Sequence, residues 1–146
     1  MVIIDSNVFA KLLIEEHDSA IAEDFFRYSI THEVPLLAPT LFYYEVLQIA
    51  LYYNHPVELT LEFMGEYLGF NLSLVQLTKE QWLDTEKMIH SGHQKSGFPS
   101  LYDSSYHALA LSKNAVFLTA DKRHESKTKQ FGAIKLLGHW EEIFDK

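Results

Sequence analysis

Residues 101–124 read LYDSSYHALALSKNAVFLTADKRH, and this stretch decides the fold class. A run with helical spacing at residues 102–113 is followed by a short apolar run at residues 116–119, which is typical of a buried strand. Asp103 opens the helical run and Asp121 follows the strand. The stretch therefore predicts a helix, then a strand, each with a carboxylate at one end.

The rest of the chain alternates in the same way. Its first residues, MVIIDSN, repeat the pattern of an apolar strand followed by an aspartate, here Asp5. Strands are also predicted at residues 2–4, 36–38, 72–76 and 134–137, helices at 7–14, 19–32, 41–54, 58–70, 79–94 and 140–144, and a polar helix or loop at 122–131. Such alternation predicts an α/β fold with a parallel sheet flanked by helices.

Several helix starts are predicted from capping residues. Ser6, Asp18 and Thr40 each precede a helical run and are expected to be N-caps. Thr78 is followed three positions later by Gln81, which is the signature of a capping box.

The composition indicates one globular domain over residues 1–146, with 47% hydrophobic and 22% charged residues. The lack of cysteine excludes disulfides, thiolate catalysis and Cys-type zinc sites, and it is compatible with a reducing cytosol, so we expect a cytoplasmic protein. We expect no signal peptide and no membrane span. The net charge of −8 argues against a passive nucleic-acid binder.

Four acids stand out, and each has an ordinary structural explanation. Asp5 and Asp103 suit helix caps, and Asp121 suits a turn. Glu45 lies in a helix that is apolar nearly all round, where an exposed stripe is the simplest interpretation. His107, one turn after Asp103, is expected at the surface or half-buried.

Considered together, the four acids suggest a site. Ligands of open parallel sheets bind at the carboxyl ends of the strands, where Asp5 and Asp121 are predicted. Two carboxylates about 4 Å apart repel by on the order of 4 kcal/mol at an effective dielectric of about 20. Such a cluster persists where a cation compensates or where some members stay protonated. Oxygen ligands without His or Cys suit Mg²⁺ or Mn²⁺.

The pieces that carry these acids resemble the PIN-domain nucleases. The matching pieces are VIIDSN, LFYYEVLQIA, YDSSYHALA and FLTADKRH, and their order and spacing extend the resemblance over essentially the whole chain. The resemblance implies a three-layer sandwich with a parallel sheet of about five strands. In size and layout the chain is most similar to the single-domain ribonuclease toxins of VapC type, which belong to toxin–antitoxin pairs.

The resemblance also implies roles for particular residues. The family's acidic set corresponds to Asp5, Glu45, Asp103 and Asp121, which would hold Mg²⁺ or Mn²⁺ and catalyse hydrolysis of RNA phosphodiester bonds. The supporting motif residues are Ser6, Asn7 and Thr119. The implied partners are RNA, a cognate antitoxin and a second copy of the chain in a homodimer.

Aromatic residues are frequent in the predicted helices. They are Phe25, Phe26, Phe42, Tyr43, Tyr44, Tyr52 and Tyr53. Most are expected in the core, and the helix after Thr40 is also a candidate for an apolar groove that binds a partner helix.

Basic residues gather after Asp121 despite the negative net charge. The segment KRHESKTKQFG at residues 122–132 is more basic and polar than the resemblance leads us to expect. We expect Lys122 and Arg123 to contact RNA phosphates. The wider basic cluster comprises His124, Lys127, Lys129, His90, His93 and Lys95, for which a solvated surface is the alternative.

Other functions remain as alternatives. A non-catalytic PIN-like module would bind RNA or a protein without cleaving it, and a metal-dependent hydrolase of small molecules would have a closed pocket rather than an open cleft. A haloacid-type phosphatase fits less well because Asn7 stands where that motif has its second Asp. A glycine-rich phosphate loop is absent from the sequence.

Overall fold

The computed structural model describes residues 1–92 and 95–145. At its centre is a five-stranded sheet in the order β3-β2-β1-β4-β5, and every neighbouring pair is parallel. The strands are β1 (Val2–Ile4), β2 (Leu36–Pro39), β3 (Leu72–Val75), β4 (Val116–Thr119) and β5 (Ile134–Leu136). The predicted α/β class and parallel five-stranded sheet are confirmed.

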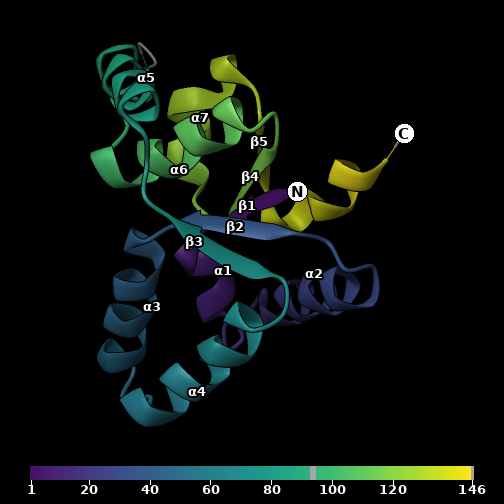
Figure 1. Ribbon diagram of the computed structural model, residues 1–146. Helices are drawn as coiled ribbons and strands as arrows, with labels where there is room; N and C mark the ends of the chain where they lie inside the picture. Colours follow the sequence, from purple (N-terminus) through teal and green to yellow (C-terminus); the bar gives the residue numbers. More distant parts are fainter. Residues whose placement is uncertain (93–94, 146) are drawn as a thin grey trace.

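Helices cover both faces of the sheet. Figure 1 shows α1 to α4 on one side and α5, α6 and α7 on the other, which gives three layers. The α-helices are α1 (Ser6–Ala10), α2 (Ser19–Thr31), α3 (Leu41–Tyr52), α4 (Val57–Leu68), α5 (Lys79–His90), α6 (Leu101–Ser112) and α7 (Lys122–Thr128), and the 3₁₀ helices are η1 (Lys129–Phe131) and η2 (Leu137–Phe144). None of the described helices is long and apolar enough to cross a membrane.

The core packs against the central strand from both sides. Val2, Ile3 and Ile4 of β1 are each 0% exposed, because β1 has a paired strand on each edge and a helical layer on each face. On one face the rings of Phe9 and Phe42 meet edge to face, with centroids 5.4 Å apart. Because α1 begins directly after β1, its first residues lie at the middle of the carboxyl edge of the sheet.

The helix ends correct two of the predicted caps. Of the two candidate caps of α1, Asp5 is the N-cap, because its side chain accepts a hydrogen bond from the backbone N–H of Asn7, and the prediction of Ser6 was wrong. Thr40 makes no capping hydrogen bond, because its backbone is helical (φ −56°, ψ −25°) rather than extended. The capping box of Thr78 with Gln81 at the start of α5 is confirmed.

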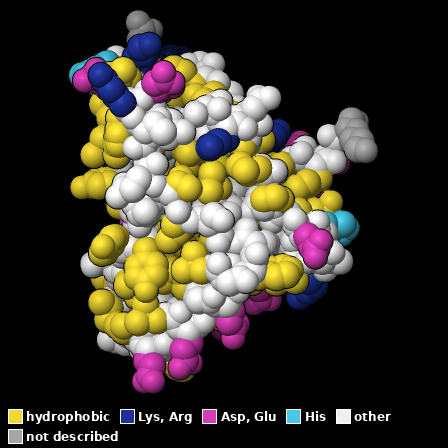
Figure 2. All heavy atoms as spheres, in the orientation of Figure 1, with side chains coloured by type: hydrophobic (Ala, Val, Ile, Leu, Met, Phe, Trp, Pro, Cys, Tyr) yellow, Lys and Arg dark blue, Asp and Glu magenta, His cyan; other side chains and the backbone are white. Residues whose placement is uncertain are grey.

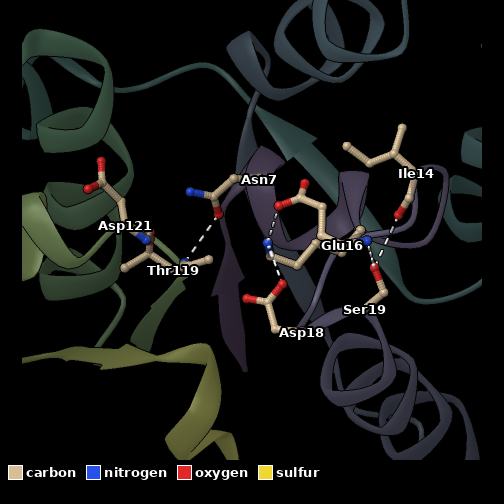
Figure 3. A network of polar contacts seen from close by, with 9 residues as sticks. Asn7, Ile14, Glu16, Asp18, Ser19, Thr119 and Asp121 are labelled. Atoms are coloured by element: carbon tan, nitrogen blue, oxygen red, sulfur yellow. Dashed lines mark hydrogen bonds and ion pairs between the residues drawn. The ribbon is translucent and has the colours of Figure 1, made fainter. Parts of the chain in front are cut away.

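Asp18 also makes no capping hydrogen bond, because it pairs with a lysine. The Nζ of Lys11 lies 2.8 Å from Oδ1 of Asp18 and 3.2 Å from Oε2 of Glu16 (Figure 3). Lys11 is 6% exposed, and its two carboxylate partners compensate for the burial of its charge. Ser19 closes the same turn by donating to the carbonyl oxygen of Ile14. This network holds α1 against the start of α2.

Candidate metal centre at the carboxyl edge of the sheet

Asp5 and Asp121 follow β1 and β4, the adjacent strands between which the chain order of the sheet reverses. Open α/β sheets bind ligands at this kind of switch point. The backbone N–H of Asp5 donates to the carbonyl oxygen of Leu118 (3.0 Å), so the strand pairing continues up to the acid. The hydroxyl of Thr119 then donates to Oδ2 of Asp5 (2.7 Å) and accepts from the backbone N–H of Asp121 (3.0 Å). Thr119 therefore joins the two acids directly.

Asn7 supports the same junction from the first turn of α1. Its Oδ1 accepts a hydrogen bond from the backbone N–H of Ala120 (3.2 Å), and Figure 3 shows its side chain facing the segment that carries Thr119 and Asp121. Asp121 is the N-cap of α7, where its Oδ1 accepts from two backbone N–H groups of the first turn. The backbone of Asp121 is thus held by the strand end before it, and its carboxylate is held by the helix after it.

Glu45 enters the site from α3. Its Oε1 accepts hydrogen bonds from Tyr106 in α6 (2.7 Å) and from Ser6 in α1 (3.3 Å), so one carboxylate connects three helices. Burial raises the pKa of Glu45, and the two hydrogen bonds oppose this rise. The predicted exposed stripe is therefore wrong for Glu45. Sequence reasoning missed Tyr106, because a tyrosine among apolar helix residues is usually a core residue.

Asp103 lies in the first turn of α6 and is not the cap of this helix. Ser100 is the N-cap: its Oγ accepts from the backbone N–H of Asp103 (3.2 Å) and donates to Oδ2 of the same residue (3.3 Å). The carboxylate of Asp103 is therefore available to the site rather than used in capping.

Neighbouring acids contribute to the raised pKa values of Asp5 and Asp103. Burial, and then the charge of Asp103, raise the pKa of Asp5 to about 7, although the hydrogen bond from Thr119 opposes the rise. Burial, and then the charges of Asp121 and Glu45, raise the pKa of Asp103 to about 6. A cation bound between acids that act on one another in this way would offset their negative charge.

The donor set fits a hard divalent cation that keeps part of its water shell. Among residues 1–92 and 95–145, no three His, Asp or Glu side chains converge closely enough to enclose one ion directly. The charges of Asp103 and Glu45 nevertheless act on Asp5, and those of Asp121 and Glu45 act on Asp103, so the acids are neighbours in an electrostatic sense. Mg²⁺ needs only one or two direct carboxylates and retains several waters, so the remaining acids would bind those waters.

The predicted basic cluster is only partly at the surface. Lys122 and Arg123 are exposed, and they line a pocket of about 420 Å³ together with Ser96, Ser126 and Lys127. His124 is 2% exposed, so its prediction as a surface residue was wrong. His107 is fully buried, which corrects the expected half-buried position. The predicted member His93 lies outside the described residues.

The fold and the site together define a class of protein: an α/β domain with an oxygen-only acidic centre at the switch point of a parallel sheet. The model of the PIN domain family matches residues 2–130, and the chain belongs to this family. The predicted resemblance is therefore confirmed.

The fold is shared with a solved structure. The crystal structure of VapC20 from Mycobacterium tuberculosis, described as a Sarcin-Ricin loop cleaving toxin, matches with a TM-score of 0.63 and 10% sequence identity. The match covers 78% of this chain and 84% of that chain. At this identity the likeness shows a common fold. No curated protein matches the chain.

Proposed function

We propose that the protein is a metal-dependent ribonuclease that hydrolyses RNA phosphodiester bonds and serves as the toxin of a VapC-type toxin–antitoxin pair. The observation that carries the proposal is the set of four acids at the switch point of a PIN domain sheet, where burial and then the charges of neighbouring acids raise the pKa values of Asp5 and Asp103. The likeness in fold to a toxin that cleaves the Sarcin-Ricin loop supports the assignment to the toxin group.

In this proposal Asp5, Asp103 and Asp121 hold Mg²⁺ or Mn²⁺, and Glu45 orients water at the same centre. A divalent cation held there acidifies water and offsets the negative charge that develops on the phosphate during hydrolysis. Thr119 keeps Asp5 oriented by its hydrogen bond of 2.7 Å. Tyr106 and Ser6 do the same for Glu45, so the chain contributes mainly a fixed geometry.

Lys122 and Arg123 are proposed to bind RNA phosphates beside the acidic centre. Both side chains are exposed, and they immediately follow Asp121 in the chain. Their charges offset the net charge of −8 near the acids, where a polyanionic substrate has to approach. The pocket that they share with Lys127 is large enough for a phosphate group.

The proposed protein partners are a cognate antitoxin and a second copy of the chain. Figure 2 shows hydrophobic side chains gathered over the face formed by α3 and α4. Tyr44, Leu51 and Tyr52 of α3 are 72%, 56% and 77% exposed, and Leu59 of α4 is 53% exposed. Large apolar side chains that gather at an exposed face favour a protein partner. Phe25, Phe26 and Phe42 belong to the core, as expected for most of the aromatic residues of the helices.

The proposed function is tested with a metal titration of the purified protein, in which thermal stability and cleavage of a mixed RNA pool are followed with Mg²⁺ or Mn²⁺. The matched control is Asp5→Asn. We expect stabilisation and cleavage in the wild type and neither in the variant. Stabilisation without cleavage would favour the non-catalytic binding module. If metal changed neither stability nor cleavage, the four acids would have only structural roles as helix caps and turn residues.

The toxin role is tested separately in cells. An active ribonuclease made without its antitoxin harms the host, so cells that express the wild type are expected to grow more slowly than cells that express Asp5→Asn. Equal growth at equal protein levels would argue against toxicity. It would not affect the conclusion about ribonuclease activity, which the metal titration tests.

A further inference from the structure

Two histidines are buried between the helices that carry Asp103 and Asp121. His107 lies one turn after Asp103 in α6, and His124 lies in the first turn of α7. Their side chains are 0% and 2% exposed. Nδ1 of His107 is 3.1 Å from Nε2 of His124, so the two rings form a hydrogen bond between α6 and α7.

The contacts determine which ring nitrogens carry protons. Nε2 of His107 is 2.7 Å from the carbonyl oxygen of Gly132, which only accepts, so this Nε2 carries the proton. In a neutral ring Nδ1 of His107 is then an acceptor, and Nε2 of His124 must donate to it. Burial lowers the pKa of both rings, that of His124 to about 3, so both are neutral at physiological pH.

The chain of hydrogen bonds is anchored in the sheet. Gly132 and Ala133, in the segment before β5, have positive φ (72° and 55°), and the Gly132 carbonyl faces His107. The carbonyl oxygen of Ala133 accepts from the backbone N–H of Phe117 in β4 (2.8 Å). The acceptor of the histidine pair is therefore held by the pairing of β4 with β5.

The other end of the chain reaches the acidic centre. The backbone N–H of His124 donates to Oδ1 of Asp121 (3.2 Å), so the position of His124 sets the orientation of this carboxylate. Burial, and then the charge of Asp121, raise the pKa of Asp103, so the two carboxylates repel each other when both are ionised. A contact that holds α6 and α7 together must therefore oppose this repulsion.

We propose that the hydrogen bond from His124 to His107 is a brace that fixes Asp121 relative to Asp103, which makes both histidines positioning residues for the divalent cation. This inference rests on the proposed metal-dependent function. Residues that orient the ligands of a metal typically change its affinity by about tenfold to a hundredfold when they are replaced. Nδ1 of His124, buried without a hydrogen-bond partner, is not needed for the brace.

The unused Nδ1 suggests a matched pair of substitutions. His124→Gln keeps an N–H donor toward Nδ1 of His107, whereas His124→Leu has a similar volume and no donor. The probe is Mn²⁺ alone, titrated calorimetrically into the full chain. We expect His124→Leu to weaken Mn²⁺ binding by roughly tenfold or more, and His124→Gln to stay within about threefold of the wild type. If the leucine variant does not fold, His124→Asn replaces it, because its amide is too short to reach His107.

The outcomes separate the brace from simple core packing. Equal Mn²⁺ affinity in all folded variants, or an equal loss in His124→Gln and His124→Leu, would overturn the proposal, because the donor would then make no difference. A core variant in α2, Phe26→Leu, shows how much affinity is lost through reduced stability alone. If the wild type itself binds no Mn²⁺, the metal-dependent function is rejected, and the positioning role with it.

Discussion

The hydroxyl of Tyr106 in α6 donates a hydrogen bond of 2.7 Å to Oε1 of Glu45 in α3. Burial and the charge of Glu45 raise the pKa of Tyr106 far above its usual range, so the hydroxyl remains a donor at every working pH. The two residues come from opposite faces of the sheet, and their contact at its carboxyl edge brings an acid from one helical layer to the acids of the other.

Tyr106→Phe is expected to reduce the rate of RNA cleavage by roughly tenfold while the protein remains folded, because Glu45 loses the group that orients it. The measurement is a single-turnover cleavage rate at saturating metal. Tyr52→Phe is the control, since it removes the same hydroxyl from a side chain that is 77% exposed. An unchanged rate in Tyr106→Phe would show that Glu45 needs no orientation.

Thr119→Val is expected to lower the free energy of unfolding by about 1–3 kcal/mol, because it leaves Oδ2 of Asp5 and the N–H of Asp121 without their hydrogen-bond partner in the interior. Urea unfolding in the presence of chelator measures this change. Thr119→Ser keeps the hydroxyl and should retain most of the stability. If the serine variant were as unstable as the valine variant, the methyl group of Thr119, and not its hydroxyl, would be the source of the stabilisation.

The strands could be predicted from the sequence because their apolar runs are continuous and end at polar residues. The predicted bounds of β1 and β4 match the structure, and Asp5 and Asp121 were placed at strand ends for the same reason. The order of the strands could not be predicted in this way, because a strand run does not show which neighbours it pairs with. The adjacency of β1 and β4, and with it the contact of Thr119 with Asp5, required the structure.

The burial of the two histidines and the identity of the helix caps could not be predicted from the sequence, for a different reason. His107 lies in a helix whose residues from Ser104 to Ala110 are all buried, since α6 packs between the sheet and other helices, and its polar ring gave no sign of this. A capping role depends on backbone angles and on competing partners. Asp18 pairs with Lys11, and Ser6 donates to Glu45, so neither serves as the cap that its position suggested.

The stability of the metal-free protein is expected to fall as pH rises through the range in which Asp5 loses its proton. Its pKa is about 7 in the folded protein against an ordinary value of 3.8, so the folded state holds a proton that the unfolded state has released. The contribution is fully present below about pH 4 and is lost toward about pH 7. Over this range Asp5 alone is expected to reduce the free energy of unfolding by on the order of 3 kcal/mol.

Thermal or urea unfolding in chelator, compared between the wild type and Asp5→Asn across this pH range, measures the effect. The comparison is needed because His107 and His124 act in the opposite direction: their lowered pKa values make the folded protein more stable as pH rises. Both proteins contain these histidines, so the difference between the two curves isolates Asp5. Parallel curves would mean that Asp5 is ionised in the folded protein throughout.

Asp103→Asn is expected to abolish cleavage and yet keep or raise the melting temperature in chelator. The substitution removes a charge that Asp121 and Glu45 repel, and an asparagine oxygen still accepts from Ser100. A gain of about 1 kcal/mol corresponds to roughly 2–8 °C. Asp84→Asn, at an exposed position of α5, controls for the loss of a charge. A large fall in melting temperature would show that Asp103 is structural.

Joint replacement of Lys122 and Arg123 by alanine is expected to weaken RNA binding without changing the cleavage rate at saturating RNA. The slope of log affinity against log salt should decrease in magnitude by about 1–2, since two phosphate contacts are lost. Binding is measured in the Asp5→Asn background, in which RNA stays intact. Arg27→Ala, on α2 and 71% exposed, is the control. An unchanged salt slope would place the RNA elsewhere.

The sheet order has a consequence for protein synthesis. The central strand is made first, but one of its two neighbours is β4, which the ribosome completes only after residue 119. The carboxylates at positions 5, 45, 103 and 121 are likewise spread over most of the chain. A nascent chain therefore has neither the pairing of β1 with β4 nor the full set of four acids until residue 121 has emerged from the ribosome, so the proposed cleavage of RNA cannot begin before that point.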